Sequence, residues 1–256
     1  ALPIGGTNCL NFGNPERPEI MWQLVEAIEG LADACRALDI PITGGNVSLY
    51  NETDGQAIYP TPIIGVVGLI EDATRAVSRT FKQAGDEVVL LGEGYGELGG
   101  SEFLKSVHGL VQGQPPELNL DKERALITLL TQAAAAGLLQ SAHDCSDGGV
   151  AVTLAECAFD TAGIGCHVDI PLSATVAGTL FGESASRAVV SATAASLQPL
   201  LQLAATLGVP ARSIGRTGGE TLVMTIAGSP AIDCPVAEAE QVWSHALGRH
   251  FGGRAA

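Results

Sequence analysis

The chain has 256 residues, of which 46% are hydrophobic and 16% charged, so it can bury a sizeable core and is not expected to be disordered. A formal net charge of −15 argues against nonspecific nucleic-acid binding, which needs a basic surface to neutralise phosphates. The six cysteines lack zinc-ligand spacing, and we expect neither a leader segment nor a membrane-spanning run. These features predict a cytoplasmic protein with reduced thiols and no nucleic-acid or membrane partner.

The first part of the chain is expected to end near residue 83, because the composition shifts between residues 80 and 86. Apolar residues recur at helical spacing from 19 to 38, which predicts an amphipathic helix. The stretch TGGNVSLYNET at 43–53 follows Pro41 and is interpreted as a loop. The apolar run at 61–70 predicts a buried strand.

Residues 84–256 alternate between strand-like and helix-like segments. Asp121 is the expected cap of a helix that ends near Gly137. The other expected elements are strands at 85–93 and 186–193, a strand–glycine turn–helix–strand unit at 141–170, a helix at 196–208, a strand pair at 211–228 and a terminal helix at 236–251. This alternation predicts an α/β (α+β) architecture, a mixed sheet with helices on one face.

The stretch HDCSDGG at 143–149 combines groups that suit a metal-bound phosphate. Asp144 and Asp147 are hard oxygen ligands, Ser146 adds a hydroxyl, and the glycines open a helix whose N-terminal amides favour an anion. A carboxylate beside a phosphate requires Mg²⁺ between them, since Mg²⁺ takes oxygen ligands and shares them with phosphates. The alternative is that Asp147 merely caps the helix.

The stretch at 43–53 offers a similar set of groups. Gly44 and Gly45 would expose main-chain amides, Asn46 a neutral oxygen for a metal, and Ser48 a hydroxyl. The alternative is a loop whose polar side chains bond only to their own backbone.

Other polar residues leave their roles open. In FGESASR at 181–187, Arg187 with the nearby serines has the donors for a phosphate clasp, and the alternative is an exposed ion pair at a strand end. Ser101 is expected to cap a helix, and His143 to be a buried, hydrogen-bonded residue rather than a base. Because no Walker A, G-x-G-x-x-G or G-x-S-x-G motif occurs, P-loop, Rossmann and classical hydrolase readings are disfavoured.

Five stretches taken together are more specific than any one of them. They are, in chain order, TNCLNFGNPERPE, GGNVSLYNET, LGGSEFL, HDCSDGG and FGESASR. In this order they resemble the phosphoribosylformylglycinamidine synthase family, in its small-type synthetase subunit form, within the superfamily of aminoimidazole ribonucleotide synthetase. The resemblance covers nearly the whole chain, but only the last part of the family's second half.

The resemblance implies an ATP-dependent ligase of purine biosynthesis. In this family ATP activates the formamide oxygen of formylglycinamide ribonucleotide, and ammonia then displaces phosphate to form the amidine. It further implies that Asn8 and Gly45 contact ATP, that Ser48 contacts the substrate, and that Asn46 ligates Mg²⁺. It implies that Ser146 and Asp144 hold the phosphates and the Mg²⁺ of an auxiliary ATP-type nucleotide that is structural rather than catalytic. At Asn8 the family usually has Asp. FGESASR matches a substrate-binding segment of the first half, and the roles of its Glu183, Ser184 and Arg187 stay open.

The resemblance also implies partners. Residues 1–83 would be a truncated N-terminal-type domain and residues 84–256 a complete C-terminal domain. The catalytic residues would lie in the missing first half, so the chain alone would be inactive, and the first half or another copy would pair with its sheet. Ammonia would come from a glutamine amidotransferase subunit, with a small accessory subunit. Two alternatives are another ATP-dependent enzyme of the superfamily, such as a small-molecule kinase, and a non-catalytic assembly module.

Overall fold

The computed structural model describes residues 1–252, and the chain divides into two compact units. The first unit is Ala1–Thr74 and the second begins at Arg75. Residues 75–83 therefore belong with the second unit, where Phe81 is buried in the core and Ser78 accepts a hydrogen bond from the backbone of Ala142.

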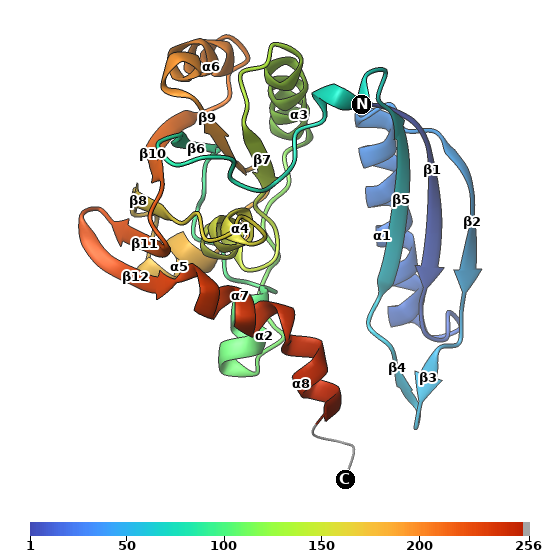
Figure 1. The fold of residues 1–256 in the computed structure, drawn as a ribbon. Coiled ribbons are helices and arrows are strands. Elements are labelled where there is room, and N and C mark those ends of the chain that lie inside the picture. Colours follow the sequence, from blue (N-terminus) through green and yellow to red (C-terminus); the bar gives the residue numbers. More distant parts are fainter. Residues whose placement is uncertain (253–256) are drawn as a thin grey trace. The chain divides into compact units, whose positions relative to one another are not determined.

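The first unit is a small sheet packed on one helix (Figure 1). The sheet order is β2-β1-β5, with β1 parallel to β2 and antiparallel to β5. Leu10 and Phe12 pack against Ile20 of the helix and form the core of this unit. Its elements are β1 (Leu2–Asn11), α1 (Pro18–Ala37), β2 (Ile42–Ser48), β3 (Glu52–Thr53), β4 (Gln56–Ala57) and β5 (Thr61–Leu69), followed by a 3₁₀ turn, Ala73–Arg75.

The predicted helix at 19–38 and the predicted strand at 61–70 are confirmed as α1 and β5. The expected burial of that strand is wrong for this chain, because every residue of β5 except Ile64 is exposed. The predicted loop at 43–53 is wrong over most of its length, because residues 42–48 form strand β2. Glycine and asparagine have low strand propensity, so this segment carries no local strand signal. Its partner β1, more than 30 residues earlier in the chain, supplies the hydrogen bonds that hold it extended.

The second unit is built on a seven-stranded mixed sheet of order β12-β11-β8-β10-β6-β9-β7. Its strands are β6 (Glu87–Leu91), β7 (Ser141–Asp144), β8 (Cys166–Ile170), β9 (Ala188–Ala192), β10 (Ala211–Thr217), β11 (Thr221–Ile226) and β12 (Ser229–Pro235). Its helices are α2 (Glu102–His108), α3 (Leu120–Ala135), α4 (Gly149–Ala158), α5 (Val176–Phe181), α6 (Ala194–Thr206), α7 (Val236–Ser244) and α8 (Ala246–Gly252). The mixed α/β architecture is confirmed, although β12 and α5 were not predicted.

The interior strand β6 explains why this sheet carries helices on both faces. Val88 and Leu90 pack into a core with α4, α5 and α7, whereas Val89 and Leu91 pack into a second core with α3 and α6. A strand with four consecutive apolar residues, such as Val88–Leu91, must be covered on both sides. The prediction of helices on one face only is therefore wrong. The apolar run in EVVLL already indicated a strand that is buried on both faces.

The helix caps differ in part from those predicted. Ser101 caps α2 as expected, and its hydroxyl accepts a hydrogen bond from the backbone of Leu104. Asp121 does not cap α3, because the Asn119 side chain accepts hydrogen bonds from the backbone of Asp121 and Lys122. Asp121 lies one residue inside the helix, where its charge still favours the positive helix end.

Three segments meet at one edge of this sheet. Ala188, the first residue of β9, pairs with Leu91 on one side and with Asp144 on the other. Leu91 ends β6 and Asp144 ends β7, so the loops after both strands lie beside the loop that enters β9. This edge carries the polar sequence motifs of the second unit.

Two expectations from the composition can be compared with the structure. All six cysteines are free thiols. Among residues 1–252, no helix combines the length and the apolar character needed to cross a membrane.

The buried thiols allow a test of the second unit's core. Burial raises the pKa of Cys145 to about 11 and that of Cys166 to about 12, and it also raises the pKa of Cys157. A raised pKa keeps the thiol neutral at pH 8, and only the thiolate reacts. We expect a thiol reagent at pH 8 to modify only the other three cysteines rapidly, namely Cys9, Cys35 and Cys234.

Mass spectrometry of the labelled peptides would identify the modified sites, and the same experiment in denaturant should label all six. Rapid labelling of Cys157 in the folded chain would contradict the packing described here.

Candidate functional site

Strand pairing in the first unit brings the predicted residues together in two groups. Asn8 of β1 lies directly beside Gly45 of β2. Side chains alternate along a strand, so Asn46 and Ser48 lie on the face opposite to that of Asn8 and Gly45. Leu10, two residues after Asn8, is buried with residues of α1. Asn8 and Gly45 therefore share the helix-covered face, and Asn46 and Ser48 share the other.

Gly45 allows a close approach that no other residue would permit. A Cβ at this position would lie 2.0 Å from Oδ1 of Asn8 and 2.3 Å from its backbone oxygen. A Cβ at Gly44 would meet no atom within 4 Å. Of the two glycines that open the motif, only Gly45 is required by the local packing.

Asn46 and Ser48 differ in how free their side chains are. Asn46 is exposed, and its amide makes no hydrogen bond to any of the residues that the structure describes. Ser48 is half-buried, and its hydroxyl is bonded to the side chain of Asn51. The Asn51 amide also donates to the backbone oxygens of Phe12 and Ser48, at 3.0 and 2.9 Å. Asn51 thus holds the end of β2 in place, a role that sequence reasoning missed.

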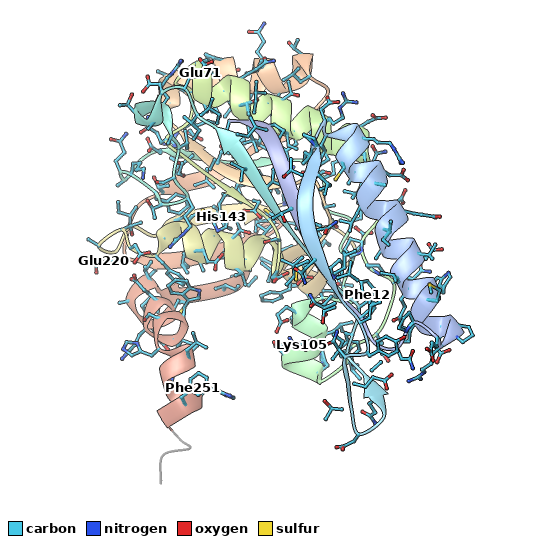
Figure 2. All side chains as sticks on the ribbon, turned by 90° about the vertical axis from the view of Figure 1, so that its right-hand side faces the viewer. Phe12, Glu71, Lys105, His143, Glu220 and Phe251 are labelled. Atoms are coloured by element: carbon cyan, nitrogen blue, oxygen red, sulfur yellow. The ribbon has the colours of Figure 1, made fainter. Side chains whose placement is uncertain are left out.

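In the second unit, the turn HDCSDGG presents an exposed carboxylate next to a held histidine. Asp144 ends β7, and 76% of its side chain is exposed. His143, in the same strand (Figure 2), lies 3.1 Å from Asp144 through Nδ1 and 3.1 Å from Glu156 through Nε2. The expectation that His143 is hydrogen-bonded is confirmed, and its side chain is partly rather than fully buried. Ser146 and Asp147 are exposed and lie in the turn before α4.

Glu183 caps the helix that follows this turn. Its Oε1 accepts hydrogen bonds from the backbone N–H of Gly148, at 2.8 Å, and from that of Glu102, at 2.9 Å. Gly148 is the N-cap of α4 and Glu102 is the first residue of α2, so one carboxylate satisfies the starts of two helices. The alternative of Asp147 as the cap is wrong, because no side chain of the turn bonds to the helix start.

Ser184 and Arg187 hold the same loop from within. Ser184 is buried and accepts a hydrogen bond from the backbone of Tyr95 at 3.0 Å. Arg187 is only 4% exposed, and it donates to the backbone oxygens of Ser184 and Gly182 at 3.0 and 2.6 Å. Its burial lowers the pKa of Arg187. Arg187 is therefore neither an exposed ion pair nor a free phosphate clasp. It holds its own loop through the hydrogen bonds to the backbone.

The candidate metal ligands, Asn46 and Asp144, belong to different units. Within residues 1–252, no group of three or more His, Cys, Asp and Glu side chains is arranged to hold a metal ion. A divalent cation at either position would need further oxygen ligands, and phosphate oxygens are the usual source for Mg²⁺.

Two family matches cover most of the chain. Residues 1–70 match the AIR synthase related protein N-terminal domain, and residues 83–226 match the AIR synthase related protein C-terminal domain.

Curated relatives show the same similarity. The phosphoribosylformylglycinamidine synthase subunit PurL of Anaeromyxobacter sp. (strain Fw109-5) is 49% identical over 94% of this chain and 32% of its own length. The subunit PurL of Thermobifida fusca is 49% identical over 99% of this chain and 33% of its own length. The chain thus spans about a third of the curated relatives that it matches.

Solved structures with a similar fold come from Thermotoga maritima. PurL complexed with FGAR aligns with a TM-score of 0.73 at 18% identity, over 93% of this chain and 39% of that one. The same protein complexed with ATP, and the PurLQS structure, align with TM-scores of 0.70 and 0.69 over 94% and 92% of this chain and 38% of each of theirs. At 17–18% identity these alignments establish the shared fold.

The close approach at Gly45 predicts unequal effects of two neighbouring substitutions. Gly45→Ala should destabilise the first unit by ~1–3 kcal/mol, the usual range for forced overpacking, because the new Cβ meets Asn8. Gly44→Ala is the matched control and should change stability by less than ~0.5 kcal/mol. Urea unfolding, with hydrogen exchange of the β1 and β2 amides, would measure both. Equal stability of the two variants would refute the packing argument.

The double cap predicts that Glu183 stabilises the second unit. Glu183→Ala removes the acceptor of two backbone donors and should cost ~1–3 kcal/mol, with faster hydrogen exchange at Gly148 and Glu102. Glu183→Gln keeps an acceptor oxygen and should cost less. Glu220→Ala, at an exposed turn, is the control. Unchanged exchange at both amides in Glu183→Ala would show that the cap is not formed in solution.

Proposed function

Because this chain belongs to the AIR synthase related protein family, we propose that it contributes part of a phosphoribosylformylglycinamidine synthase. The reaction is the ATP-dependent conversion of formylglycinamide ribonucleotide and ammonia to the amidine in purine biosynthesis. The observation that carries this proposal is the 49% identity to PurL subunits over nearly the whole chain. The T. maritima PurL structures of similar fold, complexed with FGAR and with ATP, support it.

The reaction sets the chemistry that the residues must provide. Transfer of the ATP γ-phosphoryl group to the formamide oxygen makes that oxygen a leaving group, and ammonia then displaces phosphate. Two anionic molecules must be held close together, so their phosphates need neutralising groups. In a chain of net charge −15, backbone amides and a divalent cation are the available means.

We assign the nucleotide contacts to Asn8, Gly45 and Ser146, and the substrate contact to Ser48. The adjacency of Asn8 and Gly45 in paired strands supports a shared contact in the first unit. Ser146 is exposed in the turn that precedes α4, close to a helix start, where anions are favoured. The Gly148 amide is already bonded to Glu183, so a phosphate there would rely on the amides and hydroxyl of the turn before it.

We assign Mg²⁺ to Asn46 and Asp144. Each residue offers an available oxygen in its own unit: the Asn46 amide has no partner among the described residues, and the Asp144 carboxylate is largely exposed. When bound, Mg²⁺ would neutralise phosphate charge during phosphoryl transfer. Neither residue has the further protein ligands of a closed site, which suits a cation that arrives with the nucleotide.

We further propose that the rest of the active site comes from outside this sequence, since the curated relatives are about three times as long as the chain. The catalytic residues would then lie in that other part of the protein. The three-stranded sheet of the first unit ends in two edge strands, β2 and β5, and carries exposed apolar side chains. Such a sheet needs a cover, and the remaining part of the protein or a second copy would supply it.

The partners follow from the same reaction. Ammonia would be delivered by a glutamine amidotransferase subunit, with a small accessory subunit, in an assembly of the kind that the name PurLQS denotes in T. maritima. Purine biosynthesis from these substrates, together with six free thiols, supports a cytoplasmic location.

Calorimetry with ATP and Mg²⁺ would test the assigned sites. Asp144→Ala and Asn46→Ala should each weaken Mg²⁺-dependent ATP binding by at least ~10-fold, the low end of the range for groups that support bound metals. Asp233→Ala removes an exposed carboxylate elsewhere in the second unit and is the control. Chelation of Mg²⁺ should abolish the difference. Equal affinities in all variants would rule out both assignments, and the chain alone should show no synthetase turnover.

A further inference from the structure

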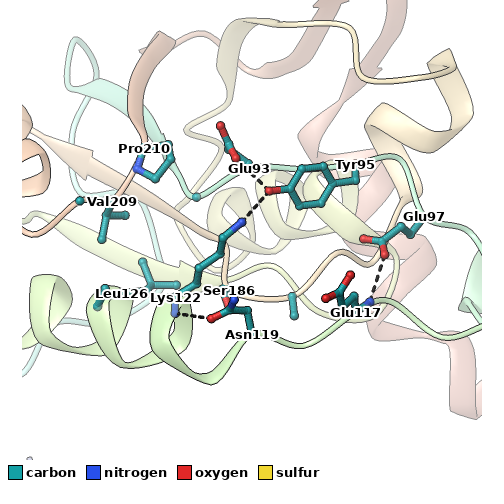
Figure 3. Close-up of a pocket in the computed structure, with 14 residues that line it drawn as sticks. Glu93, Tyr95, Glu97, Glu117, Asn119, Lys122, Leu126, Ser186, Val209 and Pro210 are labelled. Atoms are coloured by element: carbon teal, nitrogen blue, oxygen red, sulfur yellow. Dashed lines mark hydrogen bonds between the residues drawn. The ribbon is translucent and has the colours of Figure 1, made fainter.

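A cavity of about 530 Å³ lies in the second unit, apart from every residue assigned above to ATP, substrate or Mg²⁺ (Figure 3). It opens at the sheet edge where β6 ends and where β9 and β10 begin, beneath the first turns of α3. Its volume falls within the range of small-molecule sites. Its lining combines an apolar base, including Leu126 and Val209, with a polar rim.

The rim of the cavity is acidic. Among the residues that line the cavity, Glu93, Glu97 and Glu117 are acidic and Lys122 is the one cation, while the buried Arg187 interacts electrostatically with Glu97 from outside the lining. Lys122 donates a hydrogen bond to the Tyr95 hydroxyl at 2.8 Å, and that hydroxyl donates to Glu93 at 2.9 Å. The hydrogen bond to Tyr95 raises the pKa of Lys122, which stays charged. Three carboxylates and one ammonium leave the rim with a formal charge of −2.

One carboxylate of the rim, that of Glu97, has an oxygen without a hydrogen-bond donor. Its Oε1 accepts a hydrogen bond from the backbone of Glu117 at 3.0 Å. Its Oε2 is shielded from solvent and has no hydrogen-bond partner among residues 1–252. A shielded carboxylate oxygen without a donor is costly, and a donor in the cavity would remove that cost once the Glu97 side chain turned Oε2 toward it.

We infer that this cavity binds a small organic cation, with a guanidinium or primary ammonium group directed at Glu97 and Glu117 and an apolar stem over Leu126 and Val209. A guanidinium suits paired carboxylate oxygens, because it presents parallel N–H donors. The exposed ring of Tyr95 adds an aromatic wall beside the cation.

The charge of the cavity separates this site from the nucleotide sites. A phosphate would meet three carboxylates and one ammonium that is already bonded to Tyr95. The inference goes beyond the proposed synthetase function and does not depend on it. ATP and Mg²⁺ should therefore neither compete with the cation nor be required for its binding.

The test compares matched probes by calorimetry on the full chain. n-Butylguanidinium should bind at least ~10-fold more tightly than its neutral analogue n-butylurea, and n-butyl phosphate should not bind. The affinity for the guanidinium should fall as salt rises, because its attraction to the rim is electrostatic. Equal binding of the charged and neutral probes, or preferred binding of the phosphate, would overturn the inference.

Single substitutions in the lining test whether the guanidinium binds in this cavity and whether each charge raises or lowers its affinity. Glu97→Gln keeps the acceptor for Glu117 and should weaken the guanidinium at least ~10-fold, whereas Lys122→Met removes a repelling charge and should strengthen it. Glu220→Gln is the control and should change nothing. Thermal unfolding would verify that each variant is folded.

Unchanged affinity in Glu97→Gln, or weaker binding in Lys122→Met, would refute the site. Displacement of the guanidinium by ATP would refute its independence from the nucleotide sites. Failure of the ATP experiments above would leave this result untouched, so the two proposals can fail separately.

Discussion

The organisation of the second unit depends on the pairing of Ala188 with Leu91 on one side and Asp144 on the other. These two backbone pairings join residues that are 97 and 44 positions apart in the sequence. They bring the loop after β6, the loop after β7 and the loop before β9 to one sheet edge. Glu183 can then reach the starts of α2 and α4, and Ser184 can reach the backbone of Tyr95.

The Glu183 carboxylate changes the interpretation of the HDCSDGG turn. A helix start preceded by glycines and carboxylates looks, in sequence, like a free anion site. In the structure a carboxylate from another loop already occupies the amide of Gly148. What remains open to ligand is the exposed part of the turn, at Asp144 and Ser146. The metal and phosphate proposals therefore rest on these side chains and not on the helix start alone.

The residues proposed to contact nucleotide, substrate and Mg²⁺ lie in both units. Asn8, Gly45, Asn46 and Ser48 belong to the sheet of the first unit, whereas Asp144 and Ser146 belong to the turn before α4. Strand alternation further places Asn46 and Ser48 on one face of the sheet and Asn8 and Gly45 on the other, so the proposed metal and substrate contacts would lie on the face opposite to the proposed nucleotide contacts of this unit. A cation that brings its own phosphate ligands fits this dispersed set better than a closed metal site would.

The sequence by itself determined the mixed α/β class, the helix at 18–37, the strand at 61–69 and the family, because these depend on local periodicity and on ordered motifs. Only the tertiary structure decided that residues 42–48 form a strand and that Glu183 and Arg187 hold loops together. Each of these depends on a partner distant in the chain, such as β1 for β2 or Gly148 for Glu183. Local patterns carry no information about such partners, since hydrogen bonds between distant segments form only once the sheet has assembled.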